Sequence, residues 1–324
     1  MIEKYSGAME VILAATVMAL LGLLGLFIGP FYFFAMLFLP LPLVYLILKR
    51  DLLYGLYSVI LTALILLIAF NNFKSAGLLI LQFVPLGLLI GLMFKNKLTV
   101  YKSMTVLFFL ALLIAALNLL FSFVLSGTGI SQVTEEFRVI MEQMAQFYNQ
   151  NGLLDEANRQ QYLDFTEQII YLVQTLLPGN VAVWNIIMAM LTYFIAKHWM
   201  QKLGLIVADN FRFTKLQIPW YSIWLIIIGL VFTLLGDELS WQLMDVTGKN
   251  ILYIAAFIFF VLGLAVILYY VQLWRISKVV KFFLMVCLLL YLPFTAAIAI
   301  TIGMIDSVVD LRRQQIEDDG IKGD

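Results

Sequence analysis

Long apolar stretches separated by short polar segments dominate the hydrophobic pattern of the chain. Each stretch approaches the roughly 20 residues with which a helix crosses the ~30 Å hydrocarbon layer of a bilayer. Backbone groups in lipid must pair within a helix, and the short alternating segments of a membrane β-barrel are absent. The pattern therefore predicts an all-α, polytopic integral membrane helical bundle with about nine transmembrane helices, near residues 8–28, 31–48, 52–70, 76–94, 102–125, 181–200, 219–236, 251–273 and 282–303.

One long polar interval, residues 126–180, interrupts this pattern. Apolar residues recur there at helical spacing, namely Val133, Phe137, Ile140, Met141, Met144 and Phe147, followed by Tyr162, Ile169, Val173 and Leu176. The interval holds seven acidic and two basic residues, which suits the outer side of a membrane. Helices that lie on a bilayer surface usually carry Lys or Arg on the polar face, whereas the charged residues of this interval are mainly acidic. We therefore predict a long amphipathic extracytoplasmic loop that caps the bundle.

These patterns divide the chain into three parts. Residues 1–203 form a membrane bundle that includes the outer loop 126–180. Residues 204–303 add three further transmembrane helices. Residues 304–324 form a charged polar tail.

Composition identifies the solvent as lipid. The 324 residues are 63% hydrophobic and 12% charged, with a mean hydropathy of +1.00, whereas soluble domains are about 45–50% apolar and about 25% charged. The first apolar stretch is longer than the core of a signal peptide, so we expect it to be retained as a helix. Lys+Arg and Asp+Glu number 20 each, which gives no indication of a nucleic-acid partner.

Basic residues indicate the orientation, because cytoplasmic loops carry an excess of Lys and Arg. With nine spans, thirteen basic residues lie on the side of the N-terminus and seven on the other. The sequence thus predicts a multi-pass protein of the bacterial cytoplasmic membrane with a cytoplasmic N-terminus. An even number of spans would move Arg312, Arg313 and Lys322 inside and change these counts to sixteen and four.

The chain has little material for catalysis. One histidine, His198, and one cysteine, Cys287, make a metal site or a nucleophile–base pair improbable, and the common phosphate- and dinucleotide-binding motifs are absent. We predict that the protein is not an enzyme and holds neither a metal nor a cofactor.

A few polar side chains within the spans are candidates for binding a ligand: Gln82, Asn118 and Asn185. Amides in membrane helices ordinarily form interhelical hydrogen bonds. Prolines interrupt several of the same apolar stretches, at Pro40, Pro42, Pro85 and Pro293. Interrupted helices mark substrate sites in transporters, although kinks are also tolerated without function.

Small residues four apart, at Ala15/Ala19, Gly87/Gly91 and Ala111/Ala115, allow helices to approach closely. Internal packing is their ordinary use, and docking of another subunit is the alternative.

The end of the last span carries a membrane-edge polar site, to which we assign Asn250, Asp306, Asp310 and Arg313. Asp310 and Arg313 are three apart on a helix and can pair. The cluster is either a charged stop at the edge of the lipid or a site where Asp306 reaches a polar partner at the end of the bundle.

Three stretches resemble the YybS-like family of bacterial multi-pass membrane proteins, which is defined by a domain of unknown function. They are "FRFTKLQIPWYSIWL" (211–225), "NILYIAAFIFFVLGLAVILYY" (250–270) and "IGMIDSVVDLRR" (302–313). The resemblance covers nearly the whole chain and implies a polytopic membrane protein.

The first six spans also resemble the S components of energy-coupling-factor transporters, which are six-helix bundles. In that family an A-x-x-x-A patch on the first helix docks on a coupling subunit, and Ala15 and Ala19 match it. The resemblance implies small-solute binding between helices, with a coupling subunit or ATPase as a possible partner beside the lipid bilayer. The alternative is a membrane scaffold or assembly factor that acts through the outer loop.

Overall fold

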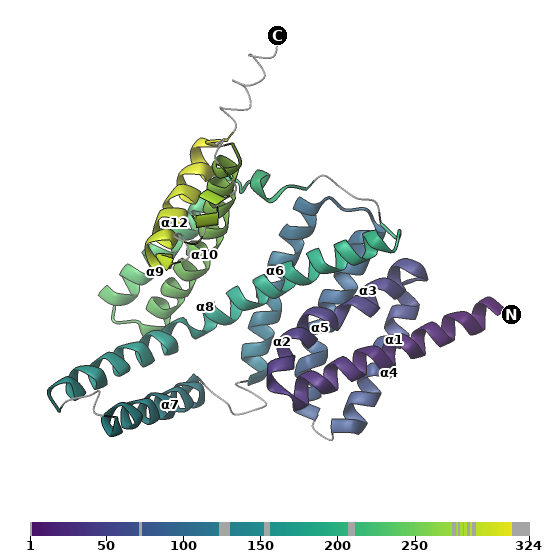
Figure 1. The fold of residues 1–324 in the computed structure, drawn as a ribbon, viewed down its shortest axis with the longest axis horizontal. Coiled ribbons are helices and arrows are strands. Elements are labelled where there is room, and N and C mark those ends of the chain that lie inside the picture. Colours follow the sequence, from purple (N-terminus) through teal and green to yellow (C-terminus); the bar gives the residue numbers. More distant parts are fainter. Residues whose placement is uncertain are drawn as a thin grey trace, which may run out of the picture. The chain divides into compact units, whose positions relative to one another are not determined.

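The computed structural model describes residues 2–70, 73–122, 130–151, 156–206, 211–273 and 290–312, together with residues 277, 279, 280, 282, 283 and 286. All regular elements in these ranges are helices (Figure 1), which confirms the all-α prediction. Their bounds are α1 Ile2–Phe27, η1 Gly29–Phe31, α2 Tyr32–Phe38, α3 Pro40–Lys49, α4 Leu52–Phe70, α5 Phe73–Lys95, α6 Val100–Phe121, α7 Ile130–Gln150, α8 Glu156–Lys202, η3 Phe213–Lys215, η4 Trp220–Ile223, α9 Trp224–Glu238, α10 Gln242–Leu273 and α12 Leu292–Val309.

Nine helical segments within the described ranges are long and apolar enough to cross a membrane. Six agree with the predicted spans within four residues at each end. The last span also differs, because its helix runs over Leu292–Val309 instead of 282–303. Pro293 therefore lies in the first turn of α12, where its missing N–H has no helical partner to lose. Residues 304–309 belong to this helix and not to a polar tail.

The chain divides into two units, each described here by itself. Unit 1 comprises Met1–Val139 and Val181–Asp209, and unit 2 comprises Ile140–Asn180 and Asn210–Asp324. The boundary after residue 209 lies close to the one predicted after residue 203. The predicted assignment of the outer loop differs from the structure, because residues 140–180 belong to unit 2.

Unit 1 packs α1, α3, α4 and α5 around a core that includes the buried side chains of Leu43, Ile47 and Leu66. Glycines let α5 approach α3. A Cβ added at Gly87 would lie 2.9 Å from Leu43 Cδ2, and one added at Gly91 would lie 2.8 Å from Ile47 Cδ1. This small-residue pair therefore serves internal packing.

Ion pairs join the ends of the unit 1 helices. Glu10 of α1 accepts from Lys49 Nζ at 2.9 Å and from Arg50 Nε at 2.9 Å. The Lys95 ammonium, 2.5 Å from Asp51 Oδ1, and the backbone N–H of Leu52 hold the pKa of Asp51 below its usual range. These contacts pair Glu10 and Asp51 with basic side chains of neighbouring helices.

In unit 2, α9 and α10 form an antiparallel pair whose backbones nearly touch at glycines. A Cβ added at Gly236 would lie 2.3 Å from the Asp245 nitrogen, and one added at Gly248 would lie 2.4 Å from the Thr233 nitrogen. Only a hydrogen atom fits at these two positions, so they set the separation of the helices.

The helices α10 and α12, side by side in Figure 1, run parallel. A Cβ at Gly303 of α12 would lie 2.0 Å from the Phe259 carbonyl of α10. Further along both helices, the Tyr270 hydroxyl donates to the Leu311 carbonyl at 3.3 Å. The amino-terminal ends of α10 and α12 therefore lie at the same end of this helix pair.

Candidate functional site

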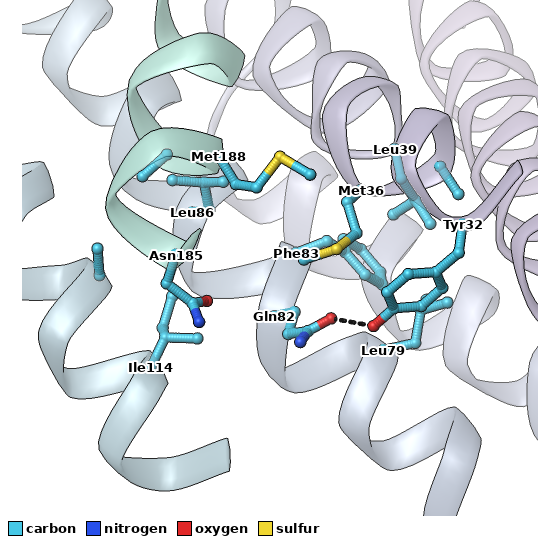
Figure 2. Close-up of a pocket in the computed structure, with 13 residues that line it drawn as sticks. Tyr32, Met36, Leu39, Leu79, Gln82, Phe83, Leu86, Ile114, Asn185 and Met188 are labelled. Carbon is cyan, nitrogen blue, oxygen red and sulfur yellow. Dashed lines mark hydrogen bonds between the residues drawn. The ribbon is translucent and has the colours of Figure 1, made fainter. Parts of the chain in front are cut away.

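A pocket lies between α2, α5, α6 and α8 inside unit 1 (Figure 2). Its volume open to the centres of water-sized molecules is about 30 Å³. Thirteen residues line it: Tyr32, Ala35, Met36, Leu39, Leu79, Gln82, Phe83, Leu86, Ala111, Ile114, Asn185, Met188 and Ala189. Most of the wall is aliphatic, aromatic or thioether, and the hydrogen-bonding side chains come from Tyr32, Gln82 and Asn185.

Tyr32 and Gln82 form the polar contact on one side of the pocket. The Tyr32 hydroxyl of α2 donates to Gln82 Oε1 of α5 at 2.7 Å, shown dashed in Figure 2. This bond turns the Gln82 carbonyl toward the phenol. The Gln82 Nε2 group then keeps two N–H donors without a hydrogen-bond acceptor among the described residues.

Asn185 projects from α8 across the pocket from Gln82 (Figure 2). Its Nδ2 donates to the Val181 carbonyl of the same helix at 2.9 Å. That bond leaves the Oδ1 acceptor and one N–H of the amide uncommitted. The pocket therefore presents unsatisfied donors and an unsatisfied acceptor within a membrane-spanning part of the chain.

Prolines lie in or next to helices that line the pocket. The segment predicted as one span divides at Leu39, since α2 ends at Phe38 and α3 begins with Pro40 and Pro42 in its first turn. Pro85 lies inside α5, one turn from Gln82. Proline has no N–H, so Pro40 and Pro85 leave the carbonyls of residues 36 and 81 without their helical donors.

The structure brings two of the three predicted ligand-binding amides together. Gln82 and Asn185 line the pocket, but Asn118 lies one helical turn beyond Ile114 on α6 and is not among the lining residues. Asn118 is buried, and its Oδ1 has no hydrogen-bond partner. Tyr32 was not among the predicted residues. It is a single hydroxyl among phenylalanines, which does not by itself distinguish it from other aromatic residues of the spans.

The predicted docking residues Ala15 and Ala19 are buried within unit 1. The Ala15 carbonyl accepts a 3.4 Å hydrogen bond from the Thr62 hydroxyl of α4. The small side chains allow α1 to pack against α4 and are covered by that contact. In this structure Ala15 and Ala19 are therefore not exposed on a surface where another subunit could dock.

The predicted membrane-edge polar site contains a buried ion pair. Arg312 Nη2 lies 2.7 Å from Asp306 Oδ2, and each side chain is at most 3% exposed. Arg312 also donates to the carbonyls of Thr214 and Leu216, at 2.7 and 2.5 Å. The partner of Asp306 is thus Arg312, and Arg313 lies outside the described residues.

Asp310, also assigned to this site, ends α12 in the left-handed conformation, with φ 51° and ψ 62°. Its carboxylate accepts from Gln217 Nε2 at 3.0 Å. The Asp306–Arg312 pair and the Asp310 cap together attach the end of α12 to the segment before α9. The charged residues at the end of α12 therefore contact a neighbouring segment of unit 2, in addition to marking the end of the apolar stretch.

Asn250, the remaining predicted member, lies elsewhere in unit 2 and bridges two backbone groups of α8. Its Oδ1 accepts from the Gly179 N–H at 2.5 Å, and its Nδ2 donates to the Thr175 carbonyl at 2.8 Å. These two groups would normally bond to each other in an α-helix. The inserted amide explains why α8 continues through Pro178 as one helix, where the sequence suggested two separate elements.

Together, the helices and their apolar surfaces define an integral, multi-pass membrane protein with contacts to the lipid bilayer. The chain belongs to the family described as "Predicted membrane protein (DUF2232)", whose model matches residues 16–307. It is 25% identical over 296 residues to the "Uncharacterized protein YybS" of Bacillus subtilis (strain 168), an alignment that covers 89% of this chain and 90% of that protein. The predicted YybS-like membership is confirmed. No solved structure matches the chain significantly.

Proposed function

We propose that the protein binds a small solute between the helices of unit 1 and takes part in its transport across the bacterial cytoplasmic membrane. One observation carries the proposal: a pocket with uncharged hydrogen-bonding groups is lined by α2, which ends just before Pro40, and by α5, which has Pro85 in its interior. Transporters commonly build substrate sites from discontinuous helices, since the interruption frees backbone groups for a ligand.

We propose that another protein supplies the energy for transport. No phosphate-binding motif is present in the chain, so energy for uptake would come from a partner such as a coupling subunit or an ATPase. Such a partner would have to contact a surface other than Ala15 and Ala19, which α4 covers. We further propose that the protein catalyses no reaction of its own.

Native mass spectrometry of protein released from its own membrane tests the solute-binding proposal. Wild-type protein is expected to retain a small molecule, and Gln82→Leu and Asn185→Leu are expected to reduce its occupancy at least tenfold, because each removes a hydrogen-bonding group from the pocket. Gln272→Leu removes an exposed amide of α10 outside the pocket and is the matched control. Wild-type protein that never retains a small molecule contradicts the proposal.

The parallel course of α10 and α12 also bears on the orientation. We propose that the number of crossings is even, because α10 and α12, each long enough to cross the membrane, run in the same direction. The basic residues then divide sixteen to four, with both termini in the cytoplasm. With nine spans, the basic residues of the C-terminal end would lie outside, against the usual excess of Lys and Arg in the cytoplasm. An even number of crossings places them inside.

Cysteine accessibility distinguishes the two topologies. In a Cys287→Ser background, Asp310→Cys is expected to react with an impermeant thiol reagent only after the cells are opened. Asn96→Cys, in the turn after α5, is the inside reference, and Glu238→Cys, at the end of α9, is the outside reference. Reaction of Asp310→Cys in intact spheroplasts would instead place the C-terminal end outside and restore nine crossings.

A second candidate function, a scaffold acting through the outer loop, is favoured by one feature of α7. Ile140, Met144 and Phe147 follow one another at helical spacing and are all exposed. If the protein is a scaffold, wild-type protein is expected to co-purify with a partner protein. Replacing these three residues with serine is expected to abolish this co-purification, whereas Gln82→Leu is expected to leave the co-purification unchanged.

A further inference from the structure

We infer that the unit 1 pocket takes a neutral, amide-like solute, one that carries a hydrogen-bond donor and an acceptor side by side on an otherwise apolar body. The inference rests on the proposed solute-binding function and names the class of solute. It follows from the hydrogen-bonding groups of the pocket, the charges in its surroundings, and its volume.

The hydrogen bonds within the pocket determine what a ligand can use. The Tyr32 hydroxyl donates to the Gln82 carbonyl, and one N–H of Asn185 donates to the Val181 carbonyl. Two N–H groups of Gln82, and the Oδ1 and one N–H of Asn185, remain for a ligand. A ligand amide has the complementary groups, because its carbonyl accepts from Gln82 while its N–H donates to Asn185.

The pocket offers no counter-charge to an ion. None of its thirteen lining residues is charged at neutral pH. The cations Lys49 and Arg50 are paired with Glu10, and Lys197 lies three turns further along α8 than Asn185, about 18 Å away along the helix. An unpaired charge in such an apolar interior is strongly disfavoured, so ionic solutes are excluded.

The volume and the wall indicate how a solute would fit. The present cavity of about 30 Å³ holds about two waters, since each needs roughly 10–15 Å³. Met36 and Met188 line the pocket beside the polar groups (Figure 2). Methionine side chains are unbranched and adapt readily, so rotation of these two side chains would enlarge the cavity for a solute.

Ligand-observed NMR on the full chain in phosphatidylcholine nanodiscs tests the inference with four ring compounds of similar size. Valerolactam has the donor and the acceptor, cyclohexanone has the acceptor alone, piperidine is cationic at neutral pH, and cyclopentanecarboxylate is anionic. Valerolactam is expected to bind saturably to wild-type protein. Its affinity should fall at least tenfold in Gln82→Leu and Asn185→Leu and stay unchanged in the control Gln272→Leu.

Each alternative result overturns a defined part of the inference. Equal binding of cyclohexanone and valerolactam removes the requirement for a donor. Binding of piperidine or cyclopentanecarboxylate that depends on Gln82 and Asn185 overturns neutrality while leaving solute binding in place. Valerolactam binding that is insensitive to both substitutions, or no binding at all, overturns the amide class. The proposed function itself fails only if wild-type protein released from its membrane retains no small molecule.

Discussion

Arg312→Ala is expected to destabilise unit 2 by about 3–5 kcal/mol, because it leaves the buried carboxylate of Asp306 without its partner. The same change removes the donors to the carbonyls of Thr214 and Leu216. For a domain of about 150–250 residues, each kcal/mol lowers the unfolding temperature by roughly 2–4 °C. Thermal unfolding in detergent micelles, followed by tryptophan fluorescence, measures the loss.

Two further variants separate the ion pair from the general effect of substitution at this end of the chain. Asp310→Asn keeps a residue that tolerates the left-handed conformation and changes only a more exposed contact with Gln217, so it should have little effect. Asp306→Leu combined with Arg312→Met removes both charges and should recover part of the stability. A double variant no more stable than Arg312→Ala would show that the unpaired carboxylate is not the cause.

Gly263→Ala is expected to be the second severe substitution, destabilising unit 2 by about 3 kcal/mol, at the upper end for overpacked cores. Its new Cβ would lie 1.8 Å from the Ala299 carbonyl oxygen of α12, which is backbone and cannot rotate away. The two helices must separate to admit it. Unfolding by sodium dodecyl sulfate titration gives the free-energy difference.

Gly77→Ala is the matched control, because it places the same methyl group in a spanning helix where the nearest atom, Phe121 Cζ, is 3.8 Å away. It should be neutral or slightly stabilising. Adding Ala299→Gly to Gly263→Ala tests the origin of the effect. Since the obstacle is the carbonyl oxygen and not the methyl group of Ala299, no rescue is expected, and full rescue would contradict the backbone-contact explanation.

The candidate pocket was predictable only in part. An amide in an apolar helix is conspicuous in a sequence, so Gln82 and Asn185 could be selected as candidates. Tyr32 could not be ranked above other aromatic residues, because its role depends on the 2.7 Å contact with a glutamine 50 positions away. Asn118 was predicted to bind the ligand but does not line the pocket. It lies on α6, one turn away from the lining residues.

The meaning of the small-residue pairs was equally open. Gly87/Gly91 and Ala15/Ala19 have the same spacing, and spacing alone allows both internal packing and docking. Burial of Ala15 and Ala19 against α4 assigns them to the interior. Spacing describes which residues share a helix face, but it does not say what covers that face.

By itself, the sequence determined the class of protein, its all-helical structure and most of the span positions, because lipid requires long apolar helices whatever their neighbours are. It also located the amphipathic segment that forms α7 and the polar end of the last helix. Tertiary structure alone decided which groups meet: Tyr32 with Gln82, Asn250 with the backbone of α8 at Gly179, and Arg312 with Asp306. It also decided the parallel course of α10 and α12, since contacts between distant residues depend on how helices pack and leave no periodic trace in the chain.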